Sequence, residues 1–594
     1  MTVNRTSNVR TCAIALATGA LVLTACSEGG GSSDDNAKEP SMAAQGITLG
    51  TAADSTGPAK EVPGAKQGGT VQVLQRDAYE YLDPGQIYVS DELIMQTVYN
   101  RTLTNYQVDD KTGRTKLVGD LATDTGTSSD GGKTWTYKLK DGLKFQDGTP
   151  ITTKDVRHSI ERLYHKSQTN GPTYLQQWLS GEGQSYRKAL PDGPYKGDHL
   201  PASVLDTPDD KTLIFHFNQP RAEVPFAVAM PNIGAVPPDK DSPKYNKKPI
   251  SSGPYKVANF KPGKGITFVR NEHWDPKTDP IRHQYVDKFE VSFGHQWVDS
   301  TRRLLADKGA DQHAMTWNNA VDPAQISTVL KDKKALARSL TRTQPYVDVV
   351  SINTSRVKNK KVREALAWAF PNGQYLQQYG GPKAGEIAGS LVGPTLKGHN
   401  KGFDPFQKKK YPGGNIAKAK ELLKEAGEEG YPIVYAYGND KPAQDASVVV
   451  ERALESAGFT VEKKELDRGT YYTQIGKVNN TYDLYRSSWS ADWPSGSTVV
   501  PTIYGGKNVY DDSPNYSHLN SPAINKEIER IAKIEDVDQA APEWVTLGER
   551  ILTEEIPQVP VFYNRLFTLW GSGIGGVKFH EPYGAVDPTA VFVK

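Results

Sequence analysis

The stretch from residue 415 to 490 alternates between helical and strand-like segments, and this pattern constrains the fold more than any other feature of the chain. Asn415 and Gly427 bracket one expected helix, because Asn caps helix N-termini and Gly ends helices in a left-handed conformation. A second expected helix, 442–457, stops at Gly458. The strand-like segments are 431–437, 459–466 and 482–489. This spacing predicts right-handed βαβ units and a parallel sheet.

The segment after the last of these strands is the first place to look for a site, because parallel sheets bind ligands beyond the carboxyl ends of their strands. That segment reads Trp489-Ser490-Ala491-Asp492-Trp493-Pro494. Elsewhere, apolar periodicity predicts strands over 68–74 and 134–139. Capping residues predict helices over 90–99, with Ser90 as the N-cap, and over 153–164.

The chain is too long for one hydrophobic core. It has 594 residues, whereas single cores stop growing near about 250–300 residues. Lys and Arg number 71 against 69 Asp and Glu, so no charge excess points to nucleic acid as a partner. The 29 Tyr and 10 Trp suit a large binding surface, although a large core would also use them.

The N-terminus has the features of an export signal. Arg5 and Arg10 precede an apolar run, 12–23, which is too short to span a bilayer as a stable helix. The run ends in Leu23-Thr24-Ala25-Cys26, which resembles the bacterial lipobox at every position. The resemblance implies cleavage after residue 25 and a lipid on Cys26 at the outer face of the cytoplasmic membrane. A plain secretory signal with an incidental cysteine is the alternative.

Cleavage would leave Cys26 as the only cysteine, so the mature chain would have no internal disulfide and no Cys-based metal site. Removing two arginines leaves 71 − 2 = 69 basic against 69 acidic residues. Residues 26–68 are rich in Gly, Ser, Pro and Ala without periodicity, which predicts a flexible tether. No later segment approaches about 18 consecutive apolar residues, so we expect membrane attachment through the lipid alone.

The sequence lacks the motifs of common enzymes. It has no Gly-x-Ser-x-Gly and neither His-x-x-x-His nor Cys-x-x-Cys. The nearest phosphate-loop candidate, 132–134, has Thr127 where a glycine is needed and precedes a strand. We therefore expect no enzymatic activity, no catalytic residue, no metal and no cofactor. A secreted hydrolase with a dispersed active site is the alternative from another class.

Several motifs give the chain a family resemblance. The stretch 126–163, which contains Gly-Lys-Thr-Trp-Thr-Tyr-Lys-Leu-Lys-Asp-Gly and Asp-Gly-Thr-Pro-Ile-Thr, is similar to the signature of family 5 extracellular solute-binding proteins. These are the oligopeptide and dipeptide receptors of ABC importers. Other matching pieces are Leu82-Asp83-Pro84, Ser252-Gly253-Pro254-Tyr255, Val362-Arg363-Glu364-Ala365-Leu366 and Trp489-Ser490-Ala491-Asp492. They occur in family order from about 69 to 570.

The resemblance implies an α/β fold of the periplasmic-binding-protein type (type II), with an extra subdomain and two hinge-connected lobes. Lobe I would comprise 69–297, with the subdomain at about 100–218. The chain would return to lobe I at 554–594. Lobe II would comprise 298–553. A ligand would lie between the lobes, which would close by hinge bending. The implied partners are a peptide ligand and the permease subunits of an ABC importer, and we expect a monomer.

The resemblance also implies a peptide site. Asp492 would pair with the peptide α-ammonium, and the peptide would lie between the lobes as an added strand. Its main chain would bond to two segments, Ser488-Trp489-Ser490 and Tyr88-Val89-Ser90. Arg486 matches a position that reaches the ligand carboxylate, and Lys477 is a second candidate for that task.

Each of these residues also has an ordinary structural interpretation. Asp492 could cap the turn after its strand, Trp489 and Trp493 could be core residues, and Arg486 could pair with a surface acid. The family often continues with a second acid and Pro, whereas this chain reads Trp493-Pro494-Ser495-Gly496. Because the family also contains binders of nickel, opines and oligosaccharides, an oligosaccharide or a nickel complex is the alternative ligand.

Overall fold

The computed structural model describes residues 47–109, 114–242 and 244–594, and all of them belong to one structural unit, residues 40–594. The predicted signal peptide and Cys26 lie outside the described residues. None of the helices within the described ranges is long and apolar enough to cross a membrane.

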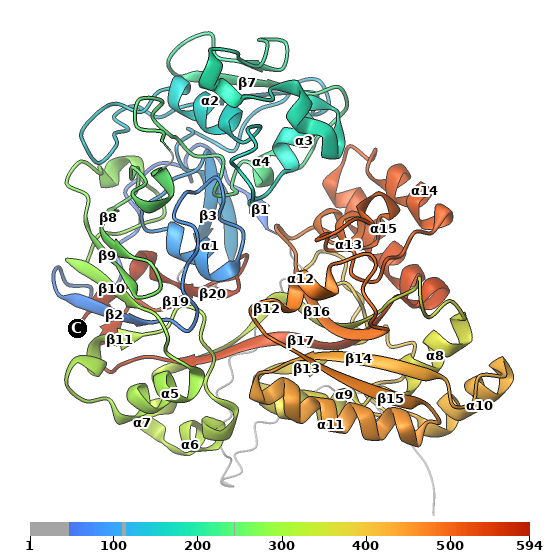
Figure 1. Ribbon diagram of the computed structural model, residues 1–594. Helices are drawn as coiled ribbons and strands as arrows, with labels where there is room; N and C mark the ends of the chain where they lie inside the picture. Colours follow the sequence, from blue (N-terminus) through green and yellow to red (C-terminus); the bar gives the residue numbers. More distant parts are fainter. Residues whose placement is uncertain (1–46, 110–113, 243) are drawn as a thin grey trace, which may run out of the picture. The chain divides into compact units, whose positions relative to one another are not determined.

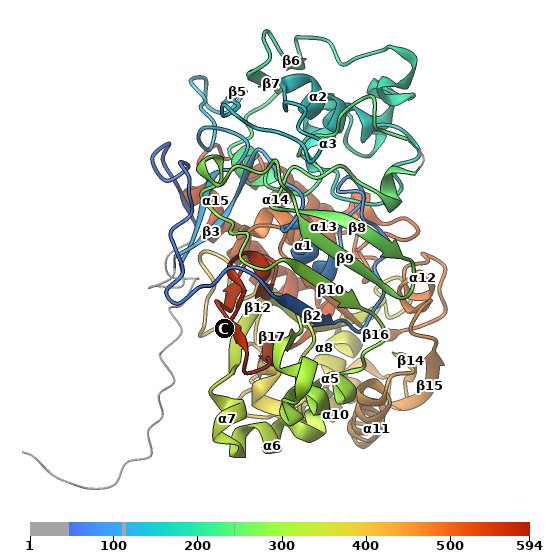
Figure 2. The same ribbon diagram turned by 90° about the vertical axis from the view of Figure 1, so that its left-hand side faces the viewer.

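A sheet of five strands in the described residues forms the centre of the part that we name lobe I. Its strands are β2 (Thr70–Leu74), β8 (Tyr255–Lys261), β9 (Gly265–Arg270), β10 (Lys288–Ser292) and β11 (Ala314–Met315). Their order is β11-β2-β10-β9-β8 (Figure 1). Strand β2 runs parallel to β10 and β11, whereas β10, β9 and β8 pair antiparallel; Figure 2 shows β2, β10, β9 and β8 from another side. The prediction of a first strand over 68–74 is confirmed by β2.

Helix α1 (Ser90–Gln96) begins where the sequence predicts, but its N-cap is Val89 and it ends three residues early. The Ser90 hydroxyl makes no cap bond because it accepts a hydrogen bond from Nδ2 of Asn318 at 3.0 Å. The expectation that Ser90 caps this helix is therefore wrong.

An outlying part of lobe I has its own core, which includes Tyr137, Leu163 and Phe215. Its strands are β1 (Thr48–Leu49), β3 (Thr104–Val108), β4 (Thr115–Gly119), β5 (Thr134–Lys138), β6 (Leu205–Asp206) and β7 (Thr212–His216). Its helices are α2 (Thr153–Arg162), α3 (Tyr174–Ser180) and α4 (Val224–Ala227). The predictions of strand 134–139 and helix 153–164 are confirmed to within two residues by β5 and α2. A capping box between Thr152 and Asp155 fixes the start of α2.

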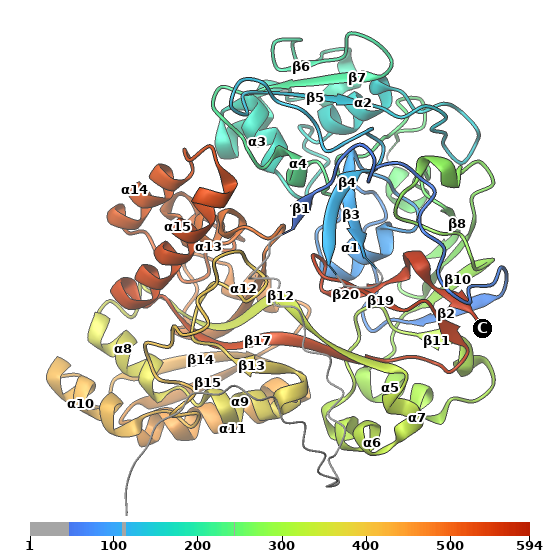
Figure 3. The same cartoon turned by 180° about the vertical axis from the view of Figure 1, so that it is seen from behind.

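Residues 47–68, which we expected to belong to the flexible tether, pack on lobe I. Strand β1 pairs in parallel with β4, as Figure 3 shows, and Ser55 is fully buried with its hydroxyl accepting from Gly119 N–H at 2.8 Å. Farther along, Ala59 N–H donates to the Asp279 carbonyl at 3.0 Å. Composition alone could not predict this packing, because the packing depends on backbone partners that are remote in sequence. Residues 47–68 are therefore part of the folded lobe and not of a free tether.

A sheet of six strands in the described residues forms the centre of lobe II. Its strands are β12 (Ser339–Ile352), β13 (Gly385–Ile387), β14 (Pro432–Gly438), β15 (Thr460–Leu466), β16 (Leu484–Ser490) and β17 (Gln558–Leu569), in the order β13-β17-β12-β16-β14-β15. The predicted parallel βαβ arrangement is confirmed, because β14 pairs in parallel with β15 and with β16.

The helices between these strands begin and end close to the predicted positions. Asn415 caps α10 (Ile416–Ala426) through a side-chain bond to Lys418 N–H, and Gly427 ends it at φ 68°. Helix α11 (Lys441–Ser456) is capped by Asp440. The other helices of this region are α8 (Lys360–Ala369), α9 (Asn372–Gln378), α12 (Tyr471–Ile475), α13 (Val500–Tyr504), α14 (Pro522–Ile531) and α15 (Val537–Arg550). Helices α5 (Trp297–Ala306), α6 (Ile326–Lys331) and α7 (Lys333–Leu336) instead pack in a core with Leu74 of lobe I (Figure 1).

Two long strands, β12 and β17, run side by side from one lobe to the other (Figure 1). Phe567 and Leu569 of β17 pack in a core with Leu74 of lobe I, whereas Val559 and Val561 of the same strand pack in the core of lobe II. The β12–β17 register shifts between Thr343 and Val347, so the ribbon is irregular where it leaves lobe I.

The chain then returns to the core of lobe I. The last strands are β18 (Ile574–Gly575), β19 (Lys578–His580), β20 (Ala585–Asp587) and β21 (Phe592–Val593). Their residues Ile574, Phe579 and Val586 pack in the same core as Val71 and Val73 of β2. Strand β11, from the range that we assign to lobe II, also joins the lobe I sheet. The exact lobe boundaries stay a prediction.

Candidate functional site

A cavity of about 620 Å³ lies between the start of α1 in lobe I and strand β16 in lobe II. Tyr88, Val89 and Ser90 line it from lobe I. Arg486, Ser488, Trp489, Ser490 and Asp492 line it from lobe II. The structure therefore brings together two segments separated by about 400 residues, at the carboxyl end of β16 where the parallel-sheet rule predicts a site.

Lys477 is the one predicted site residue that the structure does not bring to this cavity. Its ammonium is bonded to the Asp512 carboxylate at 2.8 Å and lies 3.6 Å from that of Asp511, on the exposed surface of lobe II. Because these partners are within the same lobe, the position of Lys477 is explained without a ligand.

Asp492 has an asymmetric set of hydrogen bonds. Its Oδ2 accepts from the phenol of Tyr88 at 3.0 Å and from that of Tyr174 at 2.5 Å. Its backbone N–H donates to Oγ1 of Thr498 at 3.2 Å, so the turn is fixed through the main chain of Asp492 and not through its carboxylate. No described residue donates to Oδ1, which remains available to a molecule in the cavity.

No cation compensates this carboxylate within the described part of the chain. Burial raises the pKa of Asp492 to about 6, although the hydrogen bonds from Tyr174 and Tyr88 act in the opposite direction. Isolated buried carboxylates are costly, because their charge is stabilised poorly away from water. A positively charged group beside Oδ1 would compensate this charge.

Strand β16 offers a free backbone edge beside Asp492. In an antiparallel pair, every second residue directs its main-chain N–H and C=O at the partner strand. Asn353 N–H donates to the Asp483 carbonyl at 3.0 Å, so Asp483 and every second residue after it face β12. The main-chain groups of Arg486, Ser488 and Ser490 therefore point away from β12. On that side β14 pairs only as far as Tyr485. The Arg486 carbonyl accepts from the Tyr471 hydroxyl at 2.9 Å, whereas no described residue bonds to the free-edge groups of Ser488 and Ser490.

Arg486 is held by the wall of the cavity itself. Its Nε donates to Oδ1 of Asp348, whose side chain is only 1% exposed, and its guanidinium lies 5.1 Å above the ring of Tyr379. Burial opposes its charge, but the Asp348 carboxylate keeps the pKa of Arg486 well above its usual range. The terminal nitrogens of Arg486 make no hydrogen bond to described residues, so they remain able to bind an acid. The acid that pairs with Arg486 is thus a buried one and not the surface acid of the alternative.

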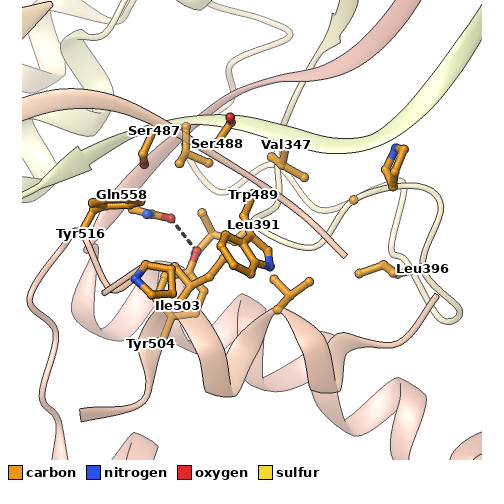
Figure 4. Close-up of a pocket in the computed structure, with 15 residues that line it drawn as sticks. Val347, Leu391, Leu396, Ser487, Ser488, Trp489, Ile503, Tyr504, Tyr516 and Gln558 are labelled. Carbon is orange, nitrogen blue, oxygen red and sulfur yellow. Dashed lines mark hydrogen bonds between the residues drawn. The ribbon is translucent and has the colours of Figure 1, made fainter. Parts of the chain in front are cut away.

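Trp489 and Trp493 have different environments. Trp489 lines the large cavity and also a second cavity of about 20 Å³, shown with Leu391 and Ile503 in Figure 4, which is too small for more than a water molecule. Its Nε1 donates to the Thr498 carbonyl at 3.1 Å. Trp493 is 2% exposed and packs among apolar residues of lobe I.

Sequence reasoning missed several residues of this site. Tyr174 belongs to α3, and nothing in its local sequence links it to Asp492. Asp348 lies opposite Ser488 on β12, so only the strand register brings it to Arg486. The abundance of tyrosine was the available signal, since Tyr346, Tyr379, Tyr472 and Tyr583 also line the cavity. Among the described residues, no group of three or more His, Cys, Asp or Glu could hold a metal ion.

Two α/β lobes with a cavity between them define a solute-binding protein. Residues 116–511 match the family "Bacterial extracellular solute-binding proteins, family 5 Middle", more than half of the chain. The chain therefore belongs to the family 5 extracellular solute-binding proteins, which are transporter binding proteins and not enzymes.

Known proteins similar to the chain agree with this family. The "Probable D,D-dipeptide-binding periplasmic protein DdpA" of Escherichia coli is 24% identical over 69% of this chain and 73% of its own length. The "Periplasmic oligopeptide-binding protein OppA" of Salmonella typhimurium is 25% identical over 75% of this chain and 79% of its own. The solved structure of "Clavulanic acid biosynthesis oligopeptide binding protein 2" is 26% identical, with a TM-score of 0.80 over 93% of this chain and all of that one.

Proposed function

We propose that this protein captures extracellular peptides through their free N-terminal ammonium group and delivers them to the permease of an ABC importer. The observation that carries the proposal is the carboxylate of Asp492, which faces the cavity with one oxygen free and has no cation partner among the described residues. A peptide N-terminus supplies the missing charge together with three hydrogen-bond donors.

The edge of β16 supports a peptide as the body of the ligand. An extended peptide that entered beside Ser488 and Ser490 would continue the sheet and satisfy their free main-chain groups. These bonds do not depend on the side chains of the ligand, so they suit a receptor that accepts many sequences. Val89 and Ser90 would face the same ligand from lobe I.

Arg486 is our candidate for the residue that binds the carboxylate end of the ligand. Its Nε already bonds to Asp348, but its terminal nitrogens are free of described partners and the residue lines the cavity. Guanidinium groups bind carboxylates through two parallel hydrogen bonds. The free α-carboxylate of a short peptide fits this position, whereas Lys477 has no part in the proposal.

A peptide accounts for the charges of the cavity better than a neutral sugar does. An oligosaccharide could stack on the tyrosines, but it would leave Asp492 without a counter-charge. The relatives include proteins named for dipeptides, oligopeptides, glutathione and deoxycholate. Native mass spectrometry of protein purified from cells grown in rich medium separates these classes, because co-purified peptides differ by amino-acid residue masses.

The decisive experiment compares Asp492→Asn with the parent protein by calorimetry, using tetra-alanine and N-acetyl tetra-alanine as probes. The Asn variant keeps the shape of the site but leaves the ammonium without its counter-charge. Loss of one partner of a buried charged pair costs about 2–5 kcal/mol, which raises Kd roughly 30-fold to several thousand-fold. Acetylation should weaken binding to the parent by a comparable factor and have little further effect on the variant.

Lys477→Ala is the matched control, because this predicted residue lies outside the cavity. It should bind free tetra-alanine like the parent. Unchanged affinity of Asp492→Asn for the free peptide would remove Asp492 from the site and with it the proposed ligand class.

We also propose that the protein is held at the outer face of the cytoplasmic membrane by a lipid on Cys26. The lipobox-like sequence at 23–26 supports this anchor. In Cys26→Ala the precursor should remain unlipidated while the remainder folds and binds ligand as before. A lipid-shifted mass and normal membrane fractionation of that variant would show that the anchor is not on Cys26.

A further inference from the structure

Trp493, the neighbour of Asp492, extends from lobe II into lobe I. It follows β16 in the loop 491–498, yet it is 2% exposed and does not line the ligand cavity. It packs in an apolar cluster in which it is the one member from lobe II among the described residues. The other buried members are Tyr106, Leu117, Phe226, Ala227, Ala229 and Met230.

The rings that receive Trp493 belong to α3. The centroid of Tyr174 lies 4.7 Å from that of Trp493, and the centroid of Trp178 lies 6.1 Å away, both in edge-to-face arrangements. Trp178 is positioned in turn by Arg221, whose guanidinium lies 5.3 Å from its ring centroid. The chain's first described residue, Ile47, packs against the same cluster. Lobe I therefore supplies the apolar surroundings of the indole ring.

The loop that presents Trp493 is fixed to lobe II. A Cβ at Gly496 would lie 2.4 Å from Cβ of Trp544 in α15, so the loop backbone is in close contact with that helix. Thr498 accepts hydrogen bonds from Nε1 of Trp489 and from the N–H of Asp492. Because the loop cannot retract independently, Trp493 leaves these surroundings only when the lobes separate.

Polar contacts between the lobes also lie outside the ligand cavity. The hydroxyl of Ser497 donates to Oε2 of Glu223 in lobe I at 2.6 Å. At another point between the lobes, Arg468 and Asp77 lie 3.5 Å apart, with both side chains about half exposed. Exposed ion pairs of this kind contribute little, so the buried indole contributes more to lobe contact than this ion pair does.

We propose that Trp493 is a latch: its insertion into the lobe I cluster holds the lobes together over a bound ligand and sets how long the ligand stays. Burial of an indole does not depend on the chemistry of the ligand. The latch therefore acts on peptides of any sequence, and it would act equally on another class of ligand.

The test follows the separation of the lobes directly. Asp77→Cys and Arg468→Cys in a Cys26→Ser background, produced without residues 1–25, provide two label sites that face each other between the lobes. Electron paramagnetic resonance then gives the distance distribution with and without a tryptic digest of casein, a peptide pool that serves as the probe. In the parent we expect the digest to increase a short-distance population.

Trp493→Ala should reduce that short-distance population in both samples. Truncation of buried interface tryptophans commonly weakens an interface about 30-fold or more, and most of such a loss is in the dissociation rate. The dissociation rate of bound peptides should therefore rise by a similar factor. Trp178→Ala, which alters the surroundings of the indole from the other lobe, should do the same, and the double variant should be little worse than either single one.

Trp274→Ala is the control for loss of a half-buried tryptophan elsewhere in lobe I, and it should leave the distances unchanged. Circular dichroism checks that each variant is folded. The proposal is wrong if Trp493→Ala and Trp178→Ala keep the short-distance population of the parent, or if the parent has none with the digest. The double variant Arg486→Gln with Asp348→Asn distinguishes the latch from ligand recognition, since both side chains belong to lobe II: it should alter affinity for peptide carboxylates but not the distances in the ligand-free protein.

Discussion

Tyr174 donates its phenolic hydrogen to Oδ2 of Asp492 at 2.5 Å, although the two residues are 318 positions apart in the chain. Tyr174 also contacts the ring of Trp493, so one side chain of lobe I meets both the ligand-facing carboxylate and the neighbouring indole of lobe II. Recognition of the ligand and contact between the lobes thus share a residue.

We expect Tyr174→Phe to weaken peptide binding by about 10- to 150-fold. It keeps the ring against Trp493 but removes a hydrogen bond to a charged group, which contributes about 1.5–3 kcal/mol. The loss should also raise the pKa of Asp492, because this hydrogen bond is the main factor that lowers it. Isothermal calorimetry with tetra-alanine measures the first effect, and NMR titration of ¹³C-labelled aspartate the second.

Tyr88→Phe is the matched comparison, since its bond to the same oxygen is longer at 3.0 Å. We expect a smaller change in both quantities. Equal pKa values of Asp492 in Tyr174→Phe and the parent would show that the phenol does not control this carboxylate.

Peptide affinity should rise with pH up to about 6 and then stay constant until the peptide ammonium deprotonates near about pH 8. The ligand ammonium pairs with the ionised form of Asp492, whose pKa in the empty site is raised from 3.8 to about 6. Below that pH a proton must leave before the ammonium binds, so affinity falls about tenfold per pH unit as the pH decreases, until the pKa of the occupied site is reached. Calorimetry in matched buffers between about pH 4.5 and 7, where the peptide ammonium stays protonated, checks this profile.

The same profile measured on Asp492→Asn should be flat over this range, because the amide does not titrate. A variant that keeps the inflection near pH 6 would assign the titration to another group.

The free edge of β16 can be tested with proline, which removes a backbone N–H. Ser488→Pro removes an N–H that faces the cavity and has no described partner, so peptide affinity should fall by about 2- to 12-fold with little loss of stability. Ser487→Pro removes an N–H directed at β12, and should lower the free energy of unfolding by about 3 kcal/mol or more.

Urea denaturation and calorimetry on both variants separate the two effects. If Ser488→Pro binds tetra-alanine as tightly as the parent, the ligand does not use this N–H. If Ser487→Pro is as stable as Ser488→Pro, the strand alternation that we infer is wrong.

Arg486→Gln should destabilise the protein even without ligand. It leaves the Asp348 carboxylate, 1% exposed, without its cation, and breaking a buried pair in this way costs about 3–5 kcal/mol. The double variant Arg486→Gln with Asp348→Asn removes both charges and should recover most of that loss in urea denaturation.

The double variant then allows a clean test of the carboxylate role. Amidation of the tetra-alanine C-terminus should weaken binding to the parent but make little difference to the double variant. An equal effect of amidation on both proteins would show that Arg486 does not bind the ligand carboxylate.

The local elements of this protein are determined by its sequence. Asn415 and Gly427 mark the limits of α10 because capping and left-handed glycine geometry act over a few residues. The alternation from 431 to 489 determines a parallel sheet, and the general position of ligands in such sheets then indicates Asp492. Local rules failed at Ser90, where a side chain 228 residues away takes the hydroxyl that would have capped α1.

Only the tertiary structure decided what surrounds Asp492. Its phenol partners come from residues 88 and 174, and the acid beside Arg486 comes from the register of β12 against β16. It also decided that residues 47–68 pack on lobe I and that Trp493 is buried between the lobes. Each of these features is a contact between segments remote in the chain. The free energy of such contacts depends on how the lobes and strands are placed together, and no local pattern of residues carries that information.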